Sequence, residues 1–557
     1  MNRLLISAAH KSSGKTTITL GLAAALRARG LAVQPFKKGP DYIDPMWLSL
    51  ASGRDCHNLD FYLMGRGEIL RTFVARTRGA DLALIEGNKG LYDGLALDGG
   101  NSNAALAQLL GTPVVLVIDA RGMTRGIAPL ILGYQAFDRD IRIAGVILNR
   151  LGGARHESRL RGVIEHYTDV PVLGAVHEDE SLAIVERHLG LMPSNETGAA
   201  LEKIAAIAAV VARQVDLDRL LAVAAAAPAL PVPAGFASTL TRASPASGSG
   251  DLEDAGKEPS PLALSRPHPH SLSRREREAS RVALRAHPVC SGRGGVGENL
   301  PFGRGEPSAC LCVARRQALR ATSIRLGIAR DAAFGFYYPG DLEALRAAGA
   351  ELVPFDTLRD PRLPAVDALF LGGGFPETHM EALQANAALR RDIKRAIAGG
   401  LPVYAECGGL MYLTRGISWN GGRCEMVGAI PADTVMHAKP QGRGYVLLRE
   451  TGRGPWPAAG AGDAAAEIKA HEFHYSGLEN LAPDLEYAYE VLRGAGVDGR
   501  RDGIVYNNVL ACYSHMRDLE GNHWTARFVE FVRQCQKASS KWQVASSKKA
   551  IEPTCHL

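Results

Sequence analysis

The stretch "SAAHKSSGKTT" near the start of the chain contains the residue types that bind phosphate. Gly14 and Lys15 offer a backbone N–H and an ammonium group for phosphate oxygens. Thr16 and Thr17 follow with hydroxyl groups, the kind of ligand that reaches Mg²⁺ in such loops. The usual pattern, G-x-x-x-x-G-K-[ST], has its first glycine where this chain has Ala9. Alanine is the smallest replacement, so we expect a nucleotide-binding loop whose turn survives if φ is negative there.

Two later segments, "GPDYIDP" and "IEGNKGLYDG", supply carboxylates directly after apolar runs. The acids are Asp41, Asp44, Glu86 and Asp93. Any one of them is more often a solvated loop residue or a helix cap. Mg²⁺ prefers oxygen ligands, however, and four acids at strand ends beside a phosphate loop favour a Mg·ATP site.

A lysine pair, Lys37 and Lys38, precedes the first acidic segment. An ammonium group in this position can meet an acidic substrate. We expect one lysine of the pair to be close to such a substrate and the other to be solvated.

The segment "AECGGL" predicts a nucleophile. A cysteine between a strand and a helix is exposed, and the helix N-terminus favours its thiolate, so Cys407 is a candidate for covalent catalysis. A lone cysteine is more often core packing, but the elbow sequence argues against that. Backbone N–H groups of Gly408 and of Gly373 and Gly374 in "LFLGGGFPE" are placed to form an oxyanion hole.

A cysteine nucleophile also needs a base, and His515 follows the last expected strand. His471 and His474 in "HEFHYSG" are rival candidates. The third member of a triad is open, because Asp518 and Glu520 are only weak candidates.

Strands and helices alternate along both ends of the chain. The sequence predicts a strand over residues 3–9, a helix over 16–29, and further apolar strands that end in polar residues. This alternation predicts an α/β fold with a parallel sheet covered on both faces, whose ligands bind beyond the carboxyl ends of the strands. We expect four regions: 1–225, a disordered insertion or linker over 226–322, a second α/β domain over 323–536, and a disordered tail over 537–557.

Composition sets limits on partners. The net charge of +6 is small for 557 residues and no basic stripe is evident, so we expect no nucleic-acid partner. Nine cysteines do not suggest a disulfide framework. No uncharged apolar run reaches the roughly 18 residues that span a bilayer, and the start is too short for a signal peptide, so we expect a soluble cytoplasmic protein without a membrane partner.

The N-terminal region resembles the cobyrinic acid a,c-diamide synthase family. The resemblance lies in "VQPFKKGPDYIDP", "NLDFYLMG", "EGNKGLYDG", "GVILNRLGG" and "RHLGL". That family has an N-terminal P-loop domain similar to dethiobiotin synthetase, and it belongs to a class that includes the partition ATPases. Those ATPases carry a signature Lys where this chain has His10, which argues against a dimer switch driven by that Lys.

The resemblance implies site residues in this domain. It implies that Lys15 binds the phosphates of ATP and that Asn149 lies near the adenine. It implies that Mg²⁺ is held by Thr16, Asp41 and Glu86, and that Asp44 and Asp93 lie by the reacting carboxylates.

The C-terminal region resembles the class I glutaminases, in the form found in corrinoid amidases. That family uses the Cys of the elbow to attack glutamine and a late His as its base, which implies Cys407 and His515 here. Many class I glutaminases end in His-x-Glu, whereas this chain has His515-Met516-Arg517.

Together these resemblances imply an ATP- and glutamine-dependent ligase that amidates the a and c acetates of cobyrinic or hydrogenobyrinic acid through acyl phosphates, in cobalamin biosynthesis. Its substrates would be glutamine and a carboxylated tetrapyrrole; the oligomeric state is open, with a homodimer among the options. An alternative substrate is sirohaem, amidated by a paralogous branch linked to dissimilatory sulfite reductase, because the "AAHKSSGKT" loop and the "KKGPDYIDP" lysine pair depart from the commoner corrinoid form. An alternative of another class is a non-catalytic ATP switch.

The segment 226–322 gives the first test. Because it is rich in Pro, Gly, Ser and Arg and has no sustained period, we predict that it does not contribute to a folded core. Deleting it should leave the catalytic activity close to that of the full-length chain, measured as product formed per unit time. A deletion variant that is folded by circular dichroism but inactive would contradict this prediction.

Overall fold

The structure is a computed structural model, and it describes residues 1–549 except 185, 188–189, 197–198, 231–322 and 459–465. The described residues on both sides of the long gap belong to one compact unit. Nearly all of the segment predicted to be a disordered insertion, and the last eight residues of the chain, lie outside the described residues.

The N-terminal half is built on a seven-stranded sheet in which every pairing is parallel, in the order β3-β2-β4-β1-β5-β6-β7. Its strands are β1 (Arg3–Ala8), β2 (Val33–Lys38), β3 (His57–Leu59), β4 (Leu82–Glu86), β5 (Val114–Asp119), β6 (Ile143–Leu151) and β7 (Val172–His177). The register pairs Lys37 with Glu86, and Asp119 with Asn149. The polar ends of these strands therefore meet at one edge of the sheet.

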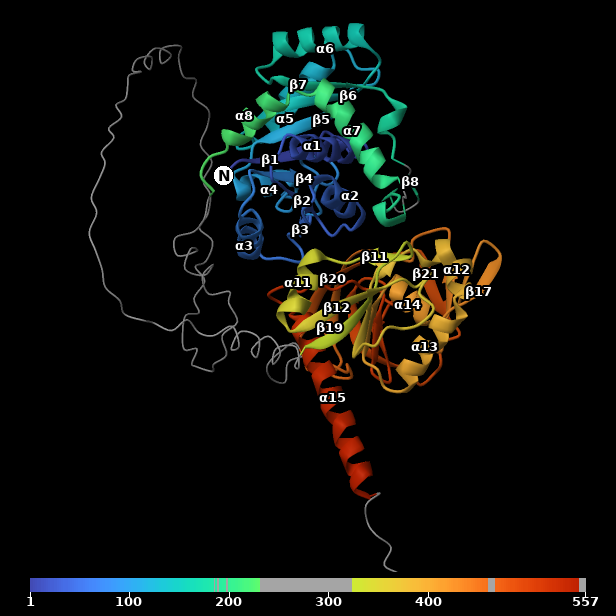
Figure 1. Ribbon diagram of the computed structural model, residues 1–557. Coiled ribbons are helices and arrows are strands. Elements are labelled where there is room, and N and C mark those ends of the chain that lie inside the picture. Colours follow the sequence, from blue (N-terminus) through green and yellow to red (C-terminus); the bar gives the residue numbers. More distant parts are fainter. Residues whose placement is uncertain (185, 188–189, 197–198, 231–322, 459–465, 550–557) are drawn as a thin grey trace, which may run out of the picture. The chain divides into compact units, whose positions relative to one another are not determined.

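Helices cover both faces of this sheet (Figure 1), as the continuous apolar strands predict. On one face lie α1 (Lys15–Ala28), α2 (Ile43–Ser52), α7 (Ala200–Gln214) and α8 (Leu217–Ala225); on the other lie α3 (Arg66–Arg76), α4 (Asn103–Leu110), α5 (Ile127–Phe137) and α6 (Ala154–Tyr167). Within β1, Leu4 and Ile6 pack into the first layer and Leu5 into the second. Alternate side chains of a strand point to opposite faces, so both faces are apolar.

The C-terminal half is a second α/β unit around a nine-stranded mixed sheet, in the order β12-β10-β13-β15-β24-β23-β22-β19-β20. Its parallel part consists of β10 (Ile324–Ala329), β12 (Ala350–Phe355), β13 (Ala368–Leu371), β15 (Val403–Glu406) and β24 (Val509–Cys512). The antiparallel part consists of β19 (Gly442–Glu450), β20 (Glu467–His474), β22 (Glu486–Arg493) and β23 (Arg501–Tyr506).

Smaller elements complete this half. The strands β11 (Phe334–Phe336) and β14 (Gly373–Gly374) form a pair, and a four-stranded sheet contains β16 (Gly416–Trp419), β17 (Gly422–Glu425), β18 (Asp433–Met436) and β21 (Ser476–Glu479). The helices are α11 (Pro339–Ala347), α12 (Met380–Ala385), α13 (Ala387–Ala398), α14 (Gly408–Leu413) and α15 (Trp524–Lys549). Both halves are therefore of the expected α/β class. The N-terminal sheet is parallel, as predicted.

Two predicted boundaries differ from the structure. The N-terminal half continues past residue 225. The buried guanidinium of Arg3 donates to the carbonyl of Pro228 at 2.6 Å and so holds this segment to the half. The helix α15 runs through residues 537–549, for which the sequence predicts a disordered tail. This segment contains no Gly or Pro, so nothing in it stops a helix that the preceding turns have begun. Among the described helices, none is long and apolar enough to cross a membrane.

The contact between α1 and α7 gives a stability prediction. A Cβ placed on Gly21 of α1 would lie 2.4 Å from Cγ2 of Val211 of α7, so Gly21→Ala should push these helices apart. We expect the free energy of unfolding to fall by about 1–3 kcal/mol, measured by urea denaturation.

The matched control is Gly133→Ala in α5, where a Cβ would meet nothing within 4 Å. Alanine is the better helix former, so this variant should be unchanged or more stable by up to about 1 kcal/mol. Equal destabilisation by both substitutions would contradict the packing argument.

Candidate active site

The predicted nucleotide-binding loop connects β1 to α1. Its turn is made by Gly14, with φ of 88°, and by Ser12, with φ of 65°, whereas Ala9 is not among the residues with positive φ. The missing first glycine therefore places no strain on this backbone. The side-chain amide of Asn149 donates to the carbonyl of Ser13 at 2.9 Å. A Cβ on Gly14 would lie 2.2 Å from that amide nitrogen, so this position requires a glycine.

Lys15 begins α1 and is buried, with 8% of its surface exposed. Burial, and next the charge of Lys37, lowers the pKa of its ammonium group to about 8. Thr17 follows in the first turn of the helix and is half-buried. A cation that has lost part of its hydration at a helix N-terminus is well suited to bind phosphate.

A compact ion cluster lies beside this helix start. The ammonium of Lys37 lies 2.8 Å from Oε1 of Glu86 and is also paired with Asp44. The hydroxyl of Thr16 donates to Glu86 at 2.7 Å and to Asp44 at 3.3 Å. Asp41 is farther out, with its carboxylate 3.7 Å from the Lys37 ammonium. The cluster joins the ends of β2 and β4 to the starts of α1 and α2.

The charges in this cluster depend on one another. Burial opposes the charge of Lys37, but the Asp44 carboxylate and then Glu86 hold the pKa of Lys37 well above its usual value. Burial also opposes ionisation of Asp44, yet the Lys37 ammonium keeps the pKa of Asp44 below its usual value. The pKa of Asp41 is raised by burial and by the neighbouring Asp44. At neutral pH the central Lys37–Asp44 pair is therefore charged.

These groups fit a Mg²⁺ ion that is also held by phosphate oxygens and water. The donors are a hydroxyl and carboxylates, and Oε2 of Glu86 is buried without a hydrogen-bond partner. Among the described residues, no group of three or more His, Cys, Asp or Glu side chains is arranged to hold a metal ion by itself. Lys37 supplies the positive charge between these carboxylates, so any Mg²⁺ would share them with Lys37.

The other predicted residues of this half fall into different places. Asp44, predicted beside the reacting carboxylates, lies closer to Thr16 than Asp41 does. Asp93 accepts from the backbone N–H of Gly90 at 2.8 Å, in the loop after β4. The prediction that one of the two neighbouring lysines is solvated is wrong, because Lys37 and Lys38 are 3% and 7% exposed. Successive side chains of a strand point to opposite sides, so Lys38 lies on the other side of β2 from Lys37. There it lines a cavity.

The predicted nucleophile lies at a strained turn in the C-terminal half. Cys407 connects β15 to α14 with φ of 48° and ψ of −101°, a conformation that non-glycine residues rarely adopt. Its backbone N–H donates to the carbonyl of Cys512 in β24 at 2.7 Å, which holds the strained residue to the sheet. Strain of this kind, held by its surroundings, is typical of functional sites.

Glycines bring a second loop against this elbow. A Cβ on Gly408 would lie 2.9 Å from the backbone nitrogen of Gly374, and one on Gly409 would lie 2.1 Å from the carbonyl oxygen of Leu371. A Cβ on Gly373 would lie 2.6 Å from the ring of His515. The glycines expected to form an oxyanion hole therefore pack closely beside the cysteine, with no room for a Cβ.

His515 is the histidine paired with this cysteine. Its Nδ1 lies 3.4 Å from Oε2 of Glu406, the residue just before Cys407, and both side chains are buried. Burial opposes the imidazolium, but hydrogen bonds and charge from Cys407 and Glu406 raise the pKa of His515 to about 10. This arrangement favours the imidazolium form of His515 beside the Cys407 sulfur.

The sequence argument missed Glu406, the carboxylate that lies beside His515. Glu406 accepts on Oε1 from the Tyr404 hydroxyl at 2.5 Å and from the Met516 N–H at 2.9 Å, which leaves Oε2 facing His515. The signal was its position at the strand end in "AECGG". Of the weak candidates, Asp518 caps the start of α15 and Glu520 pairs with Arg71.

The two rival histidines have other environments. His471 exchanges backbone hydrogen bonds with His515 and stacks on its ring, at 5.0 Å between centroids. Burial and then the charge of His515 hold the pKa of His471 well below its usual value, so it stays neutral. His474 donates from Nδ1 to the carbonyl of Ser476, 2.8 Å away.

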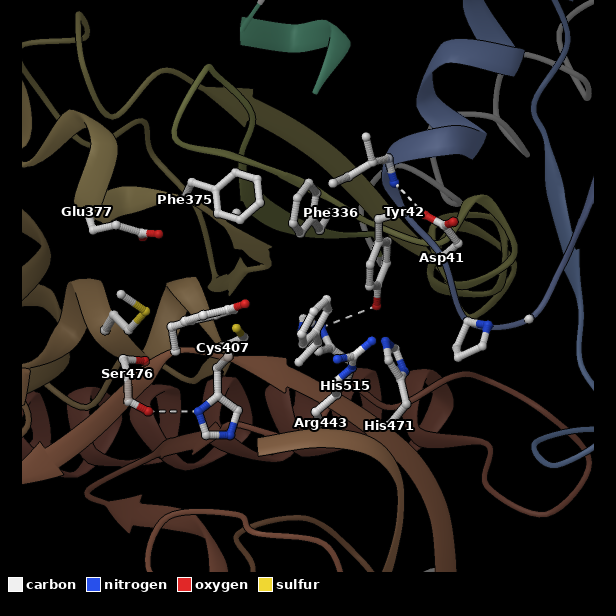
Figure 2. Close-up of a pocket in the computed structure, with 18 of the residues that line it drawn as sticks. Asp41, Tyr42, Phe336, Phe375, Glu377, Cys407, Arg443, His471, Ser476 and His515 are labelled. Carbon is white, nitrogen blue, oxygen red and sulfur yellow. Dashed lines mark hydrogen bonds between the residues drawn. The ribbon is translucent and has the colours of Figure 1, made fainter. Parts of the chain in front are cut away.

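The predicted cysteine site and the acidic loop after β2 both line one cavity of about 350 Å³. Figure 2 shows Cys407 on one side and Asp41 on the other, with His515 and Tyr42 between them. Lys38 and Arg443 also line this cavity. The predicted nucleophile thus faces the same space as the acidic loop after β2.

Glu406 gives a prediction about thiol reactivity. Glu406→Gln removes the charge beside His515, so the pKa of His515 should fall below about 10 and the thiolate–imidazolium pair should be less populated at neutral pH. We expect alkylation of Cys407 by iodoacetamide at pH 7 to slow about tenfold, because a charge-assisted hydrogen bond contributes roughly 1.5–3 kcal/mol.

The matched control is Glu520→Gln. It removes an exposed carboxylate that pairs with Arg71 and not with His515. Its alkylation rate should equal that of the unmodified chain. An unchanged rate in Glu406→Gln would exclude Glu406 as the partner of His515.

Comparison with known proteins agrees with this division of chemistry. Residues 5–191 match the family model described as a CobQ/CobB/MinD/ParA nucleotide binding domain, and residues 325–522 match a CobB/CobQ-like glutamine amidotransferase domain. Among curated relatives, the cobyrinate a,c-diamide synthase of Magnetococcus marinus is 43% identical, over 96% of this chain and 97% of the relative. Those of Methanosarcina acetivorans and Methanosarcina barkeri are 38% and 36% identical, each over 95% of this chain and over 95% and 96% of the relative. The chain therefore belongs to the cobyrinate a,c-diamide synthase family, and it is a glutamine-dependent, ATP-using amidating ligase.

Proposed function

We propose that this protein amidates the a and c acetate carboxylates of cobyrinic or hydrogenobyrinic acid, with ATP and glutamine as co-substrates. The observation that carries the proposal is the shared cavity, in which Cys407 and His515 face Lys38 and Asp41. Ammonia released at the cysteine needs to reach an activated carboxylate before it is protonated or lost to water. The names of the most similar relatives support the corrinoid substrate.

In the glutamine half-reaction, the Cys407 thiolate attacks the side-chain amide carbon. The carbonyl oxygen becomes an oxyanion, which the N–H groups of Gly374 and Gly408 are proposed to bind. The His515 imidazolium donates a proton to the leaving nitrogen, so ammonia departs and a thioester remains. His515, now neutral, takes a proton from water, which hydrolyses the thioester to glutamate and regenerates the thiolate–imidazolium pair.

In the ligase half-reaction, the acetate carboxylate attacks the γ-phosphorus of ATP, whose bond to the bridging oxygen breaks so that ADP leaves. The resulting acyl phosphate is then attacked at carbon by ammonia, which displaces phosphate and leaves the amide. Lys15 and the N–H groups of the loop would bind the phosphates, and Thr16, Glu86 and the acids after β2 would hold Mg²⁺, which neutralises charge on the transferring phosphoryl group. Most of the rate enhancement comes from positioning and charge neutralisation.

A second cavity, of about 510 Å³, supports a substrate with several carboxylates. Lys38, Lys89, Arg443 and Arg493 line it, and Asp93 lies at the same cavity. Burial lowers the pKa of Lys38 to about 8, so an anion bound there would regain the charge stabilisation that burial removes. Leu95 lines the same cavity while 60% exposed, and it offers apolar surface to the face of a macrocycle.

The two alternatives make different demands. Sirohaem also carries acetates on a reduced tetrapyrrole, so the cationic cavity alone does not discriminate between the two substrates. A non-catalytic ATP switch has no use for a strained cysteine hydrogen-bonded to a buried histidine, and that geometry argues against it.

Direct assay separates these options. We expect the purified chain, given Mg·ATP and glutamine, to convert cobyrinic acid to a diamide faster than it amidates sirohaem, with products followed by mass spectrometry. Cys407→Ala should abolish glutamine-dependent amidation and glutamine hydrolysis, while ammonium chloride still supports amidation, because the ligase residues are intact. Preferred amidation of sirohaem would replace the proposed substrate, and full glutamine-dependent activity in Cys407→Ala would exclude Cys407 as the nucleophile.

A further inference from the structure

Tyr42 connects the acidic loop of the ligase half to the base of the glutaminase half. Its hydroxyl lies 3.2 Å from Nδ1 of His515, and Figure 2 shows this hydrogen bond across the cavity. The residue follows Asp41 and lies two positions before Asp44. None of the catalytic steps proposed above uses Tyr42, although its side chain is buried against the histidine that performs them.

The position of the Tyr42 ring is fixed from several sides. It stacks on Phe336 at 5.3 Å between centroids, packs on Tyr338 at 4.4 Å, and contacts the rings of His471 and His515 at 5.6 and 5.2 Å. The ring is thus held by residues of the glutaminase half, while its backbone belongs to the loop after β2. A movement of this loop therefore moves the Tyr42 hydroxyl relative to His515.

Nδ1 of His515 has two competing partners. The Tyr42 hydroxyl lies 3.2 Å away and Oε2 of Glu406 lies 3.4 Å away. Only the carboxylate stabilises the imidazolium by charge, whereas the neutral hydroxyl competes as an acceptor for the same Nδ1–H without adding charge. The contact with Tyr42 thus competes at Nδ1 of His515 with Glu406, the partner that supports the imidazolium.

We propose that Tyr42 is a positioning residue that restrains glutamine hydrolysis until the ligase site is occupied. The proposal rests on the function proposed above. In the structure without ligands, the Tyr42 hydroxyl holds Nδ1 of His515. Occupation of the ligase site by Mg·ATP and the carboxylate substrate withdraws this hydroxyl, and Nδ1 then pairs with Glu406 alone.

The ion cluster gives a physical route for this coupling. Oδ1 of Asp41 accepts from the N–H of Ile43 at 3.0 Å, which ties Asp41 to the start of α2, and Asp44 is paired with Lys37, which ties it to β2. If the Thr16 hydroxyl served as a ligand of Mg²⁺ in the bound state, its hydrogen bond to the Asp44 carboxylate would be lost, and Asp44 would be free to shift. Any shift of Asp44 is transmitted through two peptide units to Tyr42.

Tyr42→Phe tests the proposal because it keeps the ring and removes the hydroxyl. Glutamine hydrolysis is measured in the full-length chain without and with Mg·ATP plus cobyrinic acid. We expect the unstimulated kcat to rise about three- to tenfold, the range expected for loss of one hydrogen bond, with the KM for glutamine unchanged. Stimulation by the ligase substrates should fall by the same factor, and ammonia-dependent ADP formation should match that of the unmodified chain.

The matched control is Tyr62→Phe. Its hydroxyl also links the two halves, donating to the carbonyl of Val446 at 3.2 Å, but it does not contact His515. We expect this variant to keep the unstimulated rate and the stimulation of the unmodified chain. An increase in the unstimulated rate of Tyr62→Phe equal to that of Tyr42→Phe would assign the effect to general loosening between the halves and overturn the proposal.

The remaining outcomes are also decisive. An unstimulated rate in Tyr42→Phe at or below that of the unmodified chain overturns the proposal, as does the absence of stimulation in the unmodified chain. Failure of the unmodified chain to amidate cobyrinic acid with ammonia is a different result, because it removes the proposed function and not the contact between Tyr42 and His515.

Discussion

The geometry of the ligase half depends on one buried cation. The ammonium of Lys37 is paired with Asp44 and Glu86, and through them it ties the ends of two strands to the starts of two helices. Removing an ammonium group from water is costly unless carboxylates compensate it at close range. The cluster therefore holds its members in a narrow arrangement, and the same arrangement fixes the loop that carries Tyr42 to the glutaminase histidine.

The glutaminase half obtains its precision from close backbone contact. Cys407 has a strained backbone that is held on one side by the carbonyl of Cys512 and on the other by glycines without room for a Cβ. Strain persists only where the surroundings fix it. Glu406, adjacent to Cys407 at the end of β15, and His515, after β24, then lie together, so two chain segments far apart in sequence form the proposed catalytic group.

Some of this could be predicted from the residues. The phosphate loop, the acids after β2 and β4, and the cysteine elbow all have local patterns, and the strand–helix alternation places them at the ends of parallel strands. Glu406 could not be assigned from sequence, because its role depends on Oε2 facing a histidine more than 100 residues later. The burial of both lysines at the end of β2 was missed for a similar reason, since their partners come from other segments.

The sequence by itself determined which groups are chemically available: a loop that binds phosphate, carboxylates for a cation, and a cysteine with glycines beside it. Local patterns suffice for these because each depends on the backbone preferences of a few adjacent residues. Only the tertiary structure placed the Glu406 carboxylate at His515 beside Cys407, and placed Cys407 and Asp41 at one cavity. Hydrogen-bond partners and charges act over a few ångströms of space, and the fold alone sets those distances between remote residues.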